Sequence, residues 1–525
     1  MRREEMVKAI EKTEEWDVVV IGGGASGLGA ALDSVSRGYK TLLLERDDFA
    51  KGTSSRSTKL IHGGVRYLAQ GDIALVFEAL HERGLLMQNA PHLVSNQTFV
   101  IPNYDWWGGP YYGIGLKVYD MMAGKLGLGA SENISKKKTL EAIPTVKQEG
   151  LRGGIVYKDG QFDDARLAIQ LARTIVDRGG TVTNYMGVEG LLKNEDGRIV
   201  GVETLDRESG KRYEIKAKAV INATGVFVDS ILKMDDAKAK KTIVPSQGIH
   251  LVLDKEFLPG DCAVLIPKTD DGRVLFAVPW YGKVVLGTTD TLIEKPAAEP
   301  EALRKEVKFI LKTAGQYLTR KPKRKDINSI FVGLRPLAAP KSEGKNTKEI
   351  SRGHKIVVSL SGLVTMTGGK WTTYRKMGQD AVDQALIVGG LDESASATRN
   401  LRIHGYEEKA AVDDRLAAYG TDRHELHKLI ADSLDWGDPL HPELPYTKAE
   451  VVWAIRHEMA RTVEDVLARR TRALFLDART SIQMAPIVAE LMGEELNWKE
   501  NKVKDEVNGF IDLAKRYLPN KKKED

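Results

Sequence analysis

Residues 16–46 read WDVVVIGGGASGLGAALDSVSRGYKTLLLER, and this stretch decides the fold. The all-apolar run at 18–21 is typical of a strand that is buried on both faces. Glycines follow at once, residues 28–37 predict a helix rich in alanine and leucine, and residues 41–44 predict the next strand. This order indicates a βαβ unit with G-x-G-x-x-G at its first turn and an acidic residue at the end of its second strand.

The βαβ unit has the features that bind a dinucleotide. Gly22 permits the tight turn, Gly24 lets the backbone approach a pyrophosphate, and Gly27 lets the helix pack closely on the strand. The helix N-terminus offers N–H groups and the positive end of its dipole to the phosphates. Glu45 is placed to accept hydrogen bonds from both hydroxyls of an adenosine ribose. The unit predicts a dinucleotide site and leaves the identity of the dinucleotide open.

Length and composition bound the class of protein. With 525 residues the chain is long enough for two or three domains, and 42% hydrophobic with 29% charged residues is ordinary for a soluble globular protein. Cys262 is the only cysteine, which excludes an intrachain disulfide and a cysteine-rich metal site, and we expect no metal. No apolar run approaches the roughly 20 residues of a membrane-spanning helix, and residues 1–12 are too polar for a secretory signal. We therefore expect a cytosolic protein or one attached to the inner face of a membrane. The net charge of +5 does not by itself indicate nucleic acid.

A second glycine- and hydroxyl-rich stretch, FAKGTSSRSTKLIHGGVRY at 49–67, follows the acidic residue directly. Small residues let the backbone approach a ligand, and Ser and Thr hydroxyls hydrogen-bond phosphates or ring edges. Lys59, His62 and Arg66 gather three potential cations within eight positions. We expect a ligand-binding loop here rather than a plain surface loop.

Later segments return to the same crevice. Residues 181–186, 188–194 and 199–206 predict a β meander, and the buried strand at 217–224 runs into an Ala-Thr-Gly turn. This order departs from a simple NAD-binding domain and suits the larger FAD-binding type. A second Gly-Gly–helix junction, SGLVTMTGGKWTTYR at 361–375, would aim a helix N-terminus and Lys370 at the ligand. For a flavin, that positive charge would stabilise the reduced ring near its N1/C2 carbonyl.

At this point the sequence resembles the FAD-dependent glycerol-3-phosphate dehydrogenases over nearly its whole length. The matching motifs are VIGGGASGLGAALD, GTSSRSTKLIHGGVRYL, INATGVFVD, GTTD, GLRPL, TGGKWTTYR and ARRTRALFLDA. General amino-acid oxidases share only the first glycines and the Ala-Thr-Gly turn. The resemblance implies a two-electron oxidation of sn-glycerol 3-phosphate to dihydroxyacetone phosphate. It also implies that a membrane quinone later reoxidises the FAD.

The resemblance assigns residues to the substrate. Its phosphate dianion requires fixed cations, for which the planar fork of arginine is best suited, and Arg335 and Arg352 match the phosphate-binding arginines of the family. His62, His250 and Lys370 match positions around the reacting carbon. A histidine near neutrality takes the alcohol proton, and Lys370 or Arg335 would stabilise the developing alkoxide. The choice of base between His62 and His250 stays open. The supporting substrate residues are Arg66, Tyr67 and Thr289.

The predicted FAD contacts come from four parts of the chain. The first two are Gly22, Gly24, Ala25, Ser26, Gly27, Glu45 and Arg46, followed by Thr53, Ser54, Ser55, Ser57, Lys59, Leu60, Ile61, His62 and Gly63. The other two are Val188, Ala223, Thr224 and Gly225, followed by Gly368, Gly369, Lys370 and Trp371.

The predicted fold class is α/β, with a Rossmann-like FAD-binding domain of the glutathione-reductase/D-amino-acid-oxidase type. We expect this domain to be discontinuous, over residues 14–72, 150–236 and 353–395. Residues 73–149 and 237–352 would form a β-rich substrate-binding domain, and residues 400–525 a C-terminal all-helical cap domain.

Three alternative functions stay open. An oxidase that passes electrons from the same substrate to oxygen would show nearly the same site residues. We see no added mid-chain insertion of the kind such relatives often carry, which favours the quinone-linked enzyme. A flavoprotein acting on RNA would use the lysine-rich patches at 238–241 and 321–325, but these lack interleaved aromatic residues, so we expect no nucleic acid. The presence of His62, Arg335 and Lys370 argues against a non-catalytic flavin scaffold.

Membrane attachment is implied by the quinone. Arg2-Arg3, the lysine-rich tail and Trp106-Trp107 are candidates for a monotopic contact with a lipid surface. The aromatic stretch at 104–128 would otherwise serve as core packing or as a channel wall. We expect a peripheral protein at the cytoplasmic face of the inner or plasma membrane, partly cytoplasmic, and a homodimer.

Overall fold

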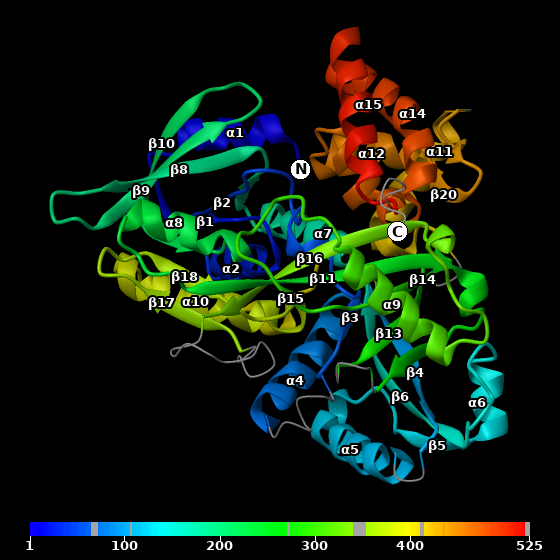
Figure 1. Ribbon diagram of the computed structural model, residues 1–525. Coiled ribbons are helices and arrows are strands. Elements are labelled where there is room, and N and C mark those ends of the chain that lie inside the picture. The colour runs from blue at the N-terminus through cyan, green and yellow to red at the C-terminus, as the bar shows by residue number, and fades with distance from the viewer. Residues whose placement is uncertain are drawn as a thin grey trace.

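The computed structural model describes residues 1–64, 72–105, 108–267, 269, 273–339, 353–409, 414–433 and 435–519, without the side chains of residues 108–112 and 125. Figure 1 shows three parts: a sheet covered by helices at the left, a second sheet at the lower right and a helical part at the upper right. This arrangement confirms the α/β class with a β-rich second part and a helical C-terminal part.

The first sheet has eight strands in the order β17-β18-β10-β1-β2-β7, with β9 beside β10 and β8 beside β9. Its central pairs are parallel, as the apolar run at 18–21 predicts. The strands are β1 Glu15–Ile21, β2 Thr41–Leu44, β7 Thr181–Thr183, β8 Met186–Lys193, β9 Ile199–Asp206, β10 Arg212–Asn222, β17 Lys355–Val358 and β18 Val364–Thr367.

Helices cover both faces of the first sheet. Helix α2 (Ala25–Ser36) lies between α7 (Asp164–Asp177) and α10 (Tyr374–Gly389) and shares with them the largest apolar core. The other face packs against α1 (Arg3–Lys12), α8 (Val228–Asp235) and the β8–β9 meander. Burial on both faces explains why the strand sequences are continuously apolar rather than alternating.

The second sheet has ten strands in the order β15-β11-β14-β13-β12-β4-β6-β3, with β16 beside β11 and β5 beside β6. The strands are β3 Leu60–Ile61, β4 Val94–Asn103, β5 Glu132–Ser135, β6 Gly153–Phe162, β11 Ile243–Asp254, β12 Ala263–Ile266, β13 Leu275–Trp280, β14 Lys283–Gly287, β15 Thr291–Leu292 and β16 Ser329–Ala338. Its helices are α4 Ile73–Asn89, α5 Gly108–Ala123, α6 Lys136–Ala142 and α9 Arg304–Tyr317.

Two strands of this second sheet come from residue ranges that the sequence predicts to belong to the FAD-binding domain. Strand β6 pairs with β4 over ten residue pairs, and β3 pairs with β6. Because β3 directly follows the hydroxyl-rich loop, that loop bridges the two sheets. The chain therefore passes between the two sheets within residues 14–72 and within residues 150–236.

The C-terminal part is helical apart from one short sheet. It contains α11 Arg423–Asp432, β19 Pro439–His441, β20 Leu444–Thr447, α12 Lys448–Glu458, a π-helical turn Asp465–Arg470, α13 Ala473–Leu476, α14 Ala478–Leu496 and α15 Glu500–Lys515. The β19–β20 pair corrects the all-helical expectation, because strands of three and four residues carry too little periodicity to be recognised. Its apolar core continues into Trp280 and Phe331 of the second sheet.

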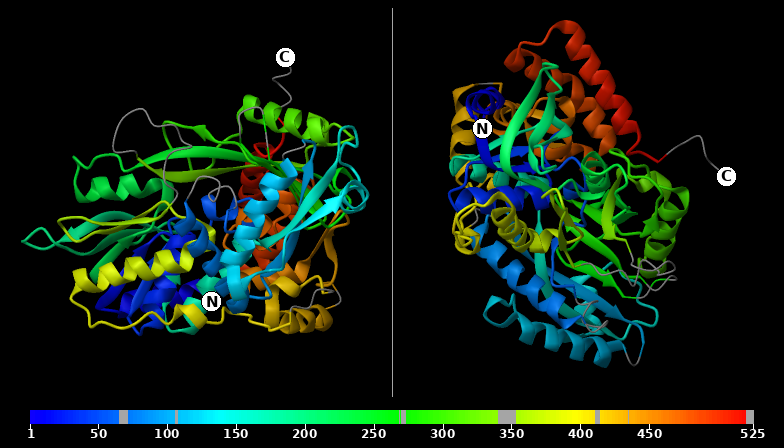
Figure 2. Two further views of the ribbon diagram at one scale, coloured as in Figure 1. Left: turned by 90° about the horizontal axis from the view of Figure 1, so that it is seen from below. Right: turned by 90° about the vertical axis from the view of Figure 1, so that its left-hand side faces the viewer.

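One residue of the predicted membrane contact has a structural role. Arg3 is buried, where Nη2 pairs with Asp206 at 2.6 Å and Nε donates to Asn184 O at 3.1 Å, so Arg3 holds α1 onto the body. Figures 1 and 2 show α1 and α5 at opposite ends of the molecule. Trp106 and Trp107 lie outside the described residues. Within the parts of the chain that the structure describes, no helix is long and apolar enough to cross a bilayer.

Candidate active site

A cavity of about 960 Å³ is lined by residues of both sheets. This volume is at the upper end of the range for small-molecule sites, so a large cofactor is a reasonable occupant. The predicted site residues on its wall are Gly22, Gly24, Ala25, Ser26, Glu45, Arg46, Thr53, Ser54, Ser57, Leu60, His62, Val188, Ala223, Thr224, Gly225, His250, Thr289, Arg335, Gly368, Gly369, Lys370 and Trp371. Gly27, Ser55, Lys59, Ile61 and Gly63 lie behind this wall. Arg66, Tyr67 and Arg352 lie outside the described residues.

The glycine turn and the Ala-Thr-Gly turn lie against each other because β1 and β10 are parallel neighbours. Gly22 has a φ of +110°, and a Cβ at this position would lie 2.7 Å from Ala223 O. A Cβ on Gly27 would overlap Gly22 O, so close packing of α2 on β1 requires glycine there. Gly24 leaves room beside Ser54 Oγ. Gly22 and Gly24 line the cavity as a cradle at the N-terminus of α2, packed closely from behind by the Ala-Thr-Gly turn.

Glu45 lies at the carboxyl end of β2, beside this cradle. Its Oε2 accepts from Gly23 N at 2.6 Å and its Oε1 accepts from Asp47 N at 2.8 Å. Burial raises the pKa of Glu45, and the two backbone donors oppose that rise. Each carboxylate oxygen keeps a further lone pair for a ligand hydroxyl.

The hydroxyl-rich loop is anchored from below by Asp164, the first residue of α7. Asp164 Oδ2 accepts from Ser57 Oγ at 2.7 Å and from the ammonium of Lys59 at 2.6 Å. Lys59 Nζ also donates to Ser55 O at 2.7 Å, and Lys59 is fully buried. Burial lowers the pKa of Lys59 to about 7 although Asp164 raises it. This corrects the predicted role of the Lys59 side chain, which braces the loop and faces away from the cavity.

Arg472 of the C-terminal part completes this anchor. Its Nη2 donates to Ser55 O at 2.8 Å and to Asp164 Oδ1 at 3.0 Å. Two neighbouring arginines bind Asp48 in the same way, since Arg470 Nη1 lies 2.7 Å and Arg469 Nε 2.5 Å from Asp48 Oδ2. All of these side chains are buried. The ARRTR motif therefore fixes the start and the middle of the loop that lines the cavity.

The second Gly-Gly junction closes the cavity from the side of β18. Gly368 and Gly369 have φ values of +73° and +83°, and a Cβ on Gly369 would overlap Met377 Sδ. A 3-10 turn, Trp371–Thr373, precedes α10, so the helix begins later than Lys370. Trp371 Nε1 donates to Ser54 O at 2.8 Å, which ties this junction to the hydroxyl-rich loop.

Two histidines face the cavity in different environments. His250 on β11 is buried, its ring stacks on Phe331 with centroids 4.7 Å apart, and its Nε2 lies 2.8 Å from Thr58 Oγ1. Burial, and then the charges of Lys59 and Arg335, lower the pKa of His250 well below its usual value. His62 follows β3, and its backbone N–H donates to Thr372 Oγ1 at 3.3 Å. The surroundings of His250 thus disfavour its charged form, and Thr372 fixes the backbone of His62.

Arg335 on β16 is held by the GTTD segment that follows β14. Its Nη2 donates to Thr288 Oγ1 at 3.2 Å, and its Nη1 lies 3.5 Å from Asp290 Oδ1. Gly248 on the neighbouring strand leaves the space that the guanidinium fills. Thr289 also lines the cavity, but its hydroxyl donates to Glu306 Oε1 at 2.9 Å and accepts from Ile249 N at 3.0 Å. Both polar functions of the Thr289 hydroxyl are therefore used inside the protein.

Sequence reasoning missed a buried relay behind His62. Gly63 N donates to Tyr119 Oη at 2.8 Å, and Tyr119 Oη donates to Asp159 Oδ2 at 2.9 Å. Arg83 Nη1 donates to Asp159 Oδ1 at 2.7 Å. Burial raises the pKa of Asp159, and Arg83 opposes that rise. These residues lie far apart in the sequence and form no motif, and the packing of α4 and α5 beside β6 brings them together.

Family models match almost the whole chain. Residues 17–375 match the family described as FAD dependent oxidoreductase, and residues 380–503 match the C-terminal domain of alpha-glycerophosphate oxidase. The mitochondrial glycerol-3-phosphate dehydrogenase of Macaca fascicularis is 41% identical over 551 residues, covering 98% of this chain and 75% of that protein. The protein of the same name from Schizosaccharomyces pombe is 37% identical and covers 97% of this chain and 89% of its own.

Solved structures agree with these matches. The glycerol-3-phosphate dehydrogenase from Bacillus halodurans, complexed with FAD, is 30% identical with a TM-score of 0.80, and the alignment covers 98% of each chain. The L-alpha-glycerophosphate oxidase from Mycoplasma pneumoniae, with FAD bound, has a TM-score of 0.55 at 17% identity, covering 74% of this chain and 98% of that one. The second likeness shows a shared fold.

Proposed function

The chain belongs to the family of FAD-dependent glycerol-3-phosphate dehydrogenases, and we propose that it oxidises sn-glycerol 3-phosphate to dihydroxyacetone phosphate and passes the electrons to a membrane quinone. The observation that carries the proposal is a single cavity lined by the dinucleotide turn, two histidines and Arg335. Such a cavity combines a cofactor site, a proton acceptor and a fixed cation.

The residues present fit FAD. The cradle at Gly22 and Gly24 would hold the pyrophosphate at the N-terminus of α2, and Glu45 would accept from the adenosine ribose. Lys370 and the glycines before it would face the flavin ring. When bound, FAD supplies a two-electron acceptor that takes the hydrogen from C2 of the substrate.

The hydroxyl proton of the substrate must go to a side chain of the protein, and we assign it to His62. Protonation of His250 is opposed by its burial and by the charges of Lys59 and Arg335. His250, as a neutral imidazole bound to Thr58, would orient the hydroxyl instead. Substitution of His62 by Asn should lower kcat by roughly 100-fold or more and remove the acidic limb of the pH profile, while His250→Asn should keep that limb. The opposite pattern would assign the base to His250.

Arg335 is the proposed phosphate ligand. Its guanidinium is fixed by Thr288 and Asp290, so it meets an anion without losing much side-chain freedom. Lys370, on the same cavity wall, would stabilise the negative charge that develops on the substrate oxygen.

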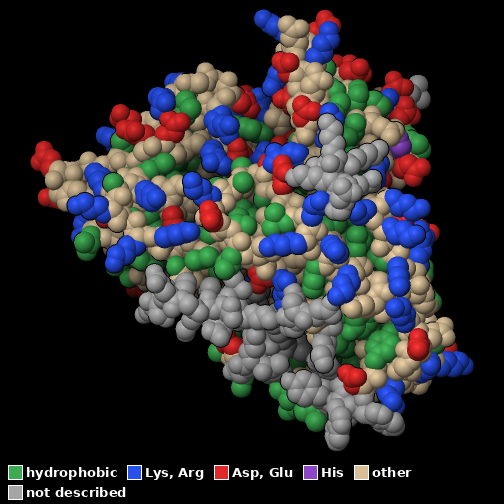
Figure 3. All heavy atoms as spheres, in the orientation of Figure 1, with side chains coloured by type: hydrophobic (Ala, Val, Ile, Leu, Met, Phe, Trp, Pro, Cys, Tyr) green, Lys and Arg blue, Asp and Glu red, His purple; other side chains and the backbone are tan. Residues whose placement is uncertain are grey.

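The membrane part of the proposal is supported by an apolar face on α4 and α5. These two neighbouring helices expose five large apolar side chains, those of Ile73, Phe77, Ile114, Val118 and Met121. Figure 3 shows hydrophobic side chains along the lower edge of the molecule, where these helices lie. A cluster of this kind is typical of a monotopic lipid contact, and a lipid-soluble quinone would reach the enzyme there.

One experiment tests the reaction and another the acceptor. Mixing the yellow protein with glycerol 3-phosphate without oxygen should bleach the flavin band and form dihydroxyacetone phosphate, while glycerol at the same concentration should leave the band unchanged. The reduced protein should then be reoxidised faster by a short-chain quinone than by oxygen. Fast reoxidation with stoichiometric hydrogen peroxide would instead support the oxidase.

A further inference from the structure

The GTTD segment at 287–290 holds more than one arginine. Asp290 Oδ1 lies 3.5 Å from Arg335 Nη1. The backbone carbonyl of Asp290 accepts a hydrogen bond from Arg273 Nη1 at 3.1 Å. Ser246 Oγ donates to Asp290 Oδ1 and fixes its orientation. Both guanidinium groups therefore contact one residue, and both arginines line the cavity.

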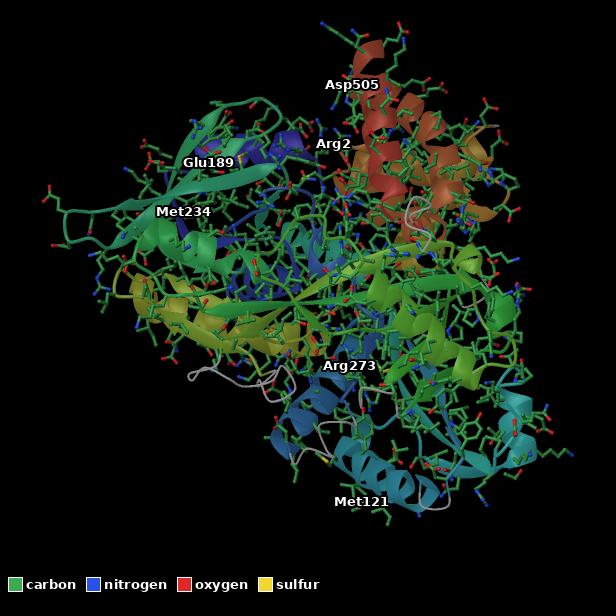
Figure 4. All side chains as sticks on the ribbon, in the orientation of Figure 1. Arg2, Met121, Glu189, Met234, Arg273 and Asp505 are labelled. Carbon is green, nitrogen blue, oxygen red and sulfur yellow. The ribbon has the colours of Figure 1, made fainter. Side chains whose placement is uncertain are left out.

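Arg273 is built into its position from two sides. Its backbone is bound to Thr269, because Arg273 N donates to Thr269 Oγ1 at 3.1 Å and Thr269 Oγ1 donates to Arg273 O at 2.8 Å. Its guanidinium lies over the ring of Phe309 on α9, 5.3 Å from the ring centroid. Figure 4 labels Arg273 near the middle of the molecule, beside the second sheet.

Two cationic side chains meet at Asp290. Arg335 Nη1 lies beside its carboxylate, and Arg273 Nη1 donates to its backbone carbonyl. A dianionic phosphate prefers several charge-assisted donors, and planar arginine forks supply them best. The electrostatic environment is thus suited to a phosphate that lies between the two arginines.

Resting on the proposed function, we propose that Arg273 is a second ligand of the substrate phosphate, beside Arg335, and that it determines the preference for glycerol 3-phosphate over unphosphorylated alcohols. The sequence pattern gave no hint of this role, because Arg273 stands alone between two apolar strands. Thr288 and Asp290 then have a shared purpose, which is to hold the two arginines at one place.

The test compares two substrates in two arginine variants. Arg273→Met should raise KM for glycerol 3-phosphate about 10- to 100-fold, the cost of one lost charge-assisted hydrogen bond, with little change in kcat. Its kcat/KM for glycerol should stay within about 3-fold of the original, because glycerol carries no phosphate. The matched control is Arg479→Met: Arg479 on α14 also donates through Nη1 to a backbone carbonyl, Ile327 O at 3.0 Å, but lies away from the cavity.

Inhibition by inorganic phosphate gives a second readout of the same site. Inorganic phosphate should inhibit the original protein and Arg479→Met competitively with glycerol 3-phosphate. Its inhibition constant should be about 10-fold or more higher for Arg273→Met. Arg273→Lys should recover part of the loss, because lysine keeps the charge without the fork.

The possible outcomes separate the two proposals. An unchanged KM and phosphate inhibition constant in Arg273→Met would overturn the role of Arg273 alone. Equal losses with glycerol and glycerol 3-phosphate, together with lost FAD, would make Arg273 a structural residue and overturn it as well. If the original protein is not reduced by glycerol 3-phosphate, the proposed function fails and the inference falls with it.

Discussion

Asp48→Asn tests whether the C-terminal part holds the flavin-binding loop in place. Asp48 is fully buried between Arg469 and Arg470, at 2.5 and 2.7 Å from Oδ2, and Arg470 Nη2 also donates to Oδ1 at 3.0 Å. Burial raises the pKa of Asp48, but the two guanidinium groups hold it well below its usual value. Asparagine keeps the shape and removes the charge. The substitution therefore removes the carboxylate that both guanidinium groups share, although Arg469 keeps its pairs with Glu464 and Asp465.

The expected cost follows from this geometry. Removing one partner of a buried ion pair destabilises a protein by about 3–5 kcal/mol, whereas an exposed pair contributes about 0–1 kcal/mol. With a urea dependence of about 3 kcal/mol/M, Asp48→Asn should shift the midpoint of FAD release down by about 1 M or more. Asp17→Asn is the matched control, because Asp17 Oδ1 lies 2.8 Å from Lys218 Nζ in an ion pair at the surface of the first sheet.

The assay is a urea titration followed by the fluorescence of released flavin. The fluorescence reports when the loop that lines the cavity loses its structure and releases FAD. The titration therefore does not require all three parts of the protein to unfold together. Replacing Arg470 by Met as well should cost less than the sum of the two single changes, because the two residues share one buried ion pair and each single change already removes it. A midpoint for Asp48→Asn that equals that of Asp17→Asn would refute the reasoning.

Two further predictions concern the membrane and acid pH. Phe77→Glu with Met121→Glu should lower binding to anionic vesicles at least about tenfold, because each apolar side chain contributes about 1.5–3 kcal/mol on burial. The control is Ile387→Glu on α10, since Ile387 is 75% exposed, comparable with Phe77 at 58% and Met121 at 81%. It should leave sedimentation with vesicles unchanged. Equal losses of binding in all variants would argue against the α4–α5 face. Burial raises the pKa of Glu464, but the charges of Arg469 and Lys51 outweigh burial and lower this pKa from an ordinary 4.5 to about 2. Because the folded pKa is the lower one, Glu464 stabilises the protein fully above pH 4.5 and loses this contribution as the pH falls towards 2, by about 3 kcal/mol in total. Glu464→Gln should flatten that part of the pH–stability curve, and an unchanged slope between pH 4.5 and 2 would contradict it.

Local patterns were sufficient to predict the cofactor half of the fold. The apolar run at 18–21, the glycine turn and the Ala-Thr-Gly strand each carry their structure in a few adjacent residues, and the structure brings them together. Helices such as α4 and α12 followed from their periodicity. The membership of β3 and β6 in the second sheet did not, because strand pairing between distant segments leaves no local mark.

Side-chain direction was the part of the site that the sequence could not supply. Lys59 stands among ligand-binding residues in the sequence, yet a buried carboxylate 105 positions away, Asp164, draws its ammonium below the loop. The hydroxyl of Thr289 is likewise taken by Glu306 on a helix that begins after it. Arg273 has no motif at all. In each case the partner is brought near only by the tertiary fold.

The most direct test of the central claim is rapid anaerobic mixing with glycerol 3-phosphate that carries deuterium at C2. The account predicts that flavin bleaching is slowed severalfold by the deuterium, since the C2 hydrogen is transferred in that step. In Arg335→Ala the same isotope effect should appear at a much higher substrate concentration, with unchanged FAD content. Bleaching without an isotope effect in both proteins, or no bleaching at all, would contradict the assignment of this cavity as the site of glycerol 3-phosphate oxidation.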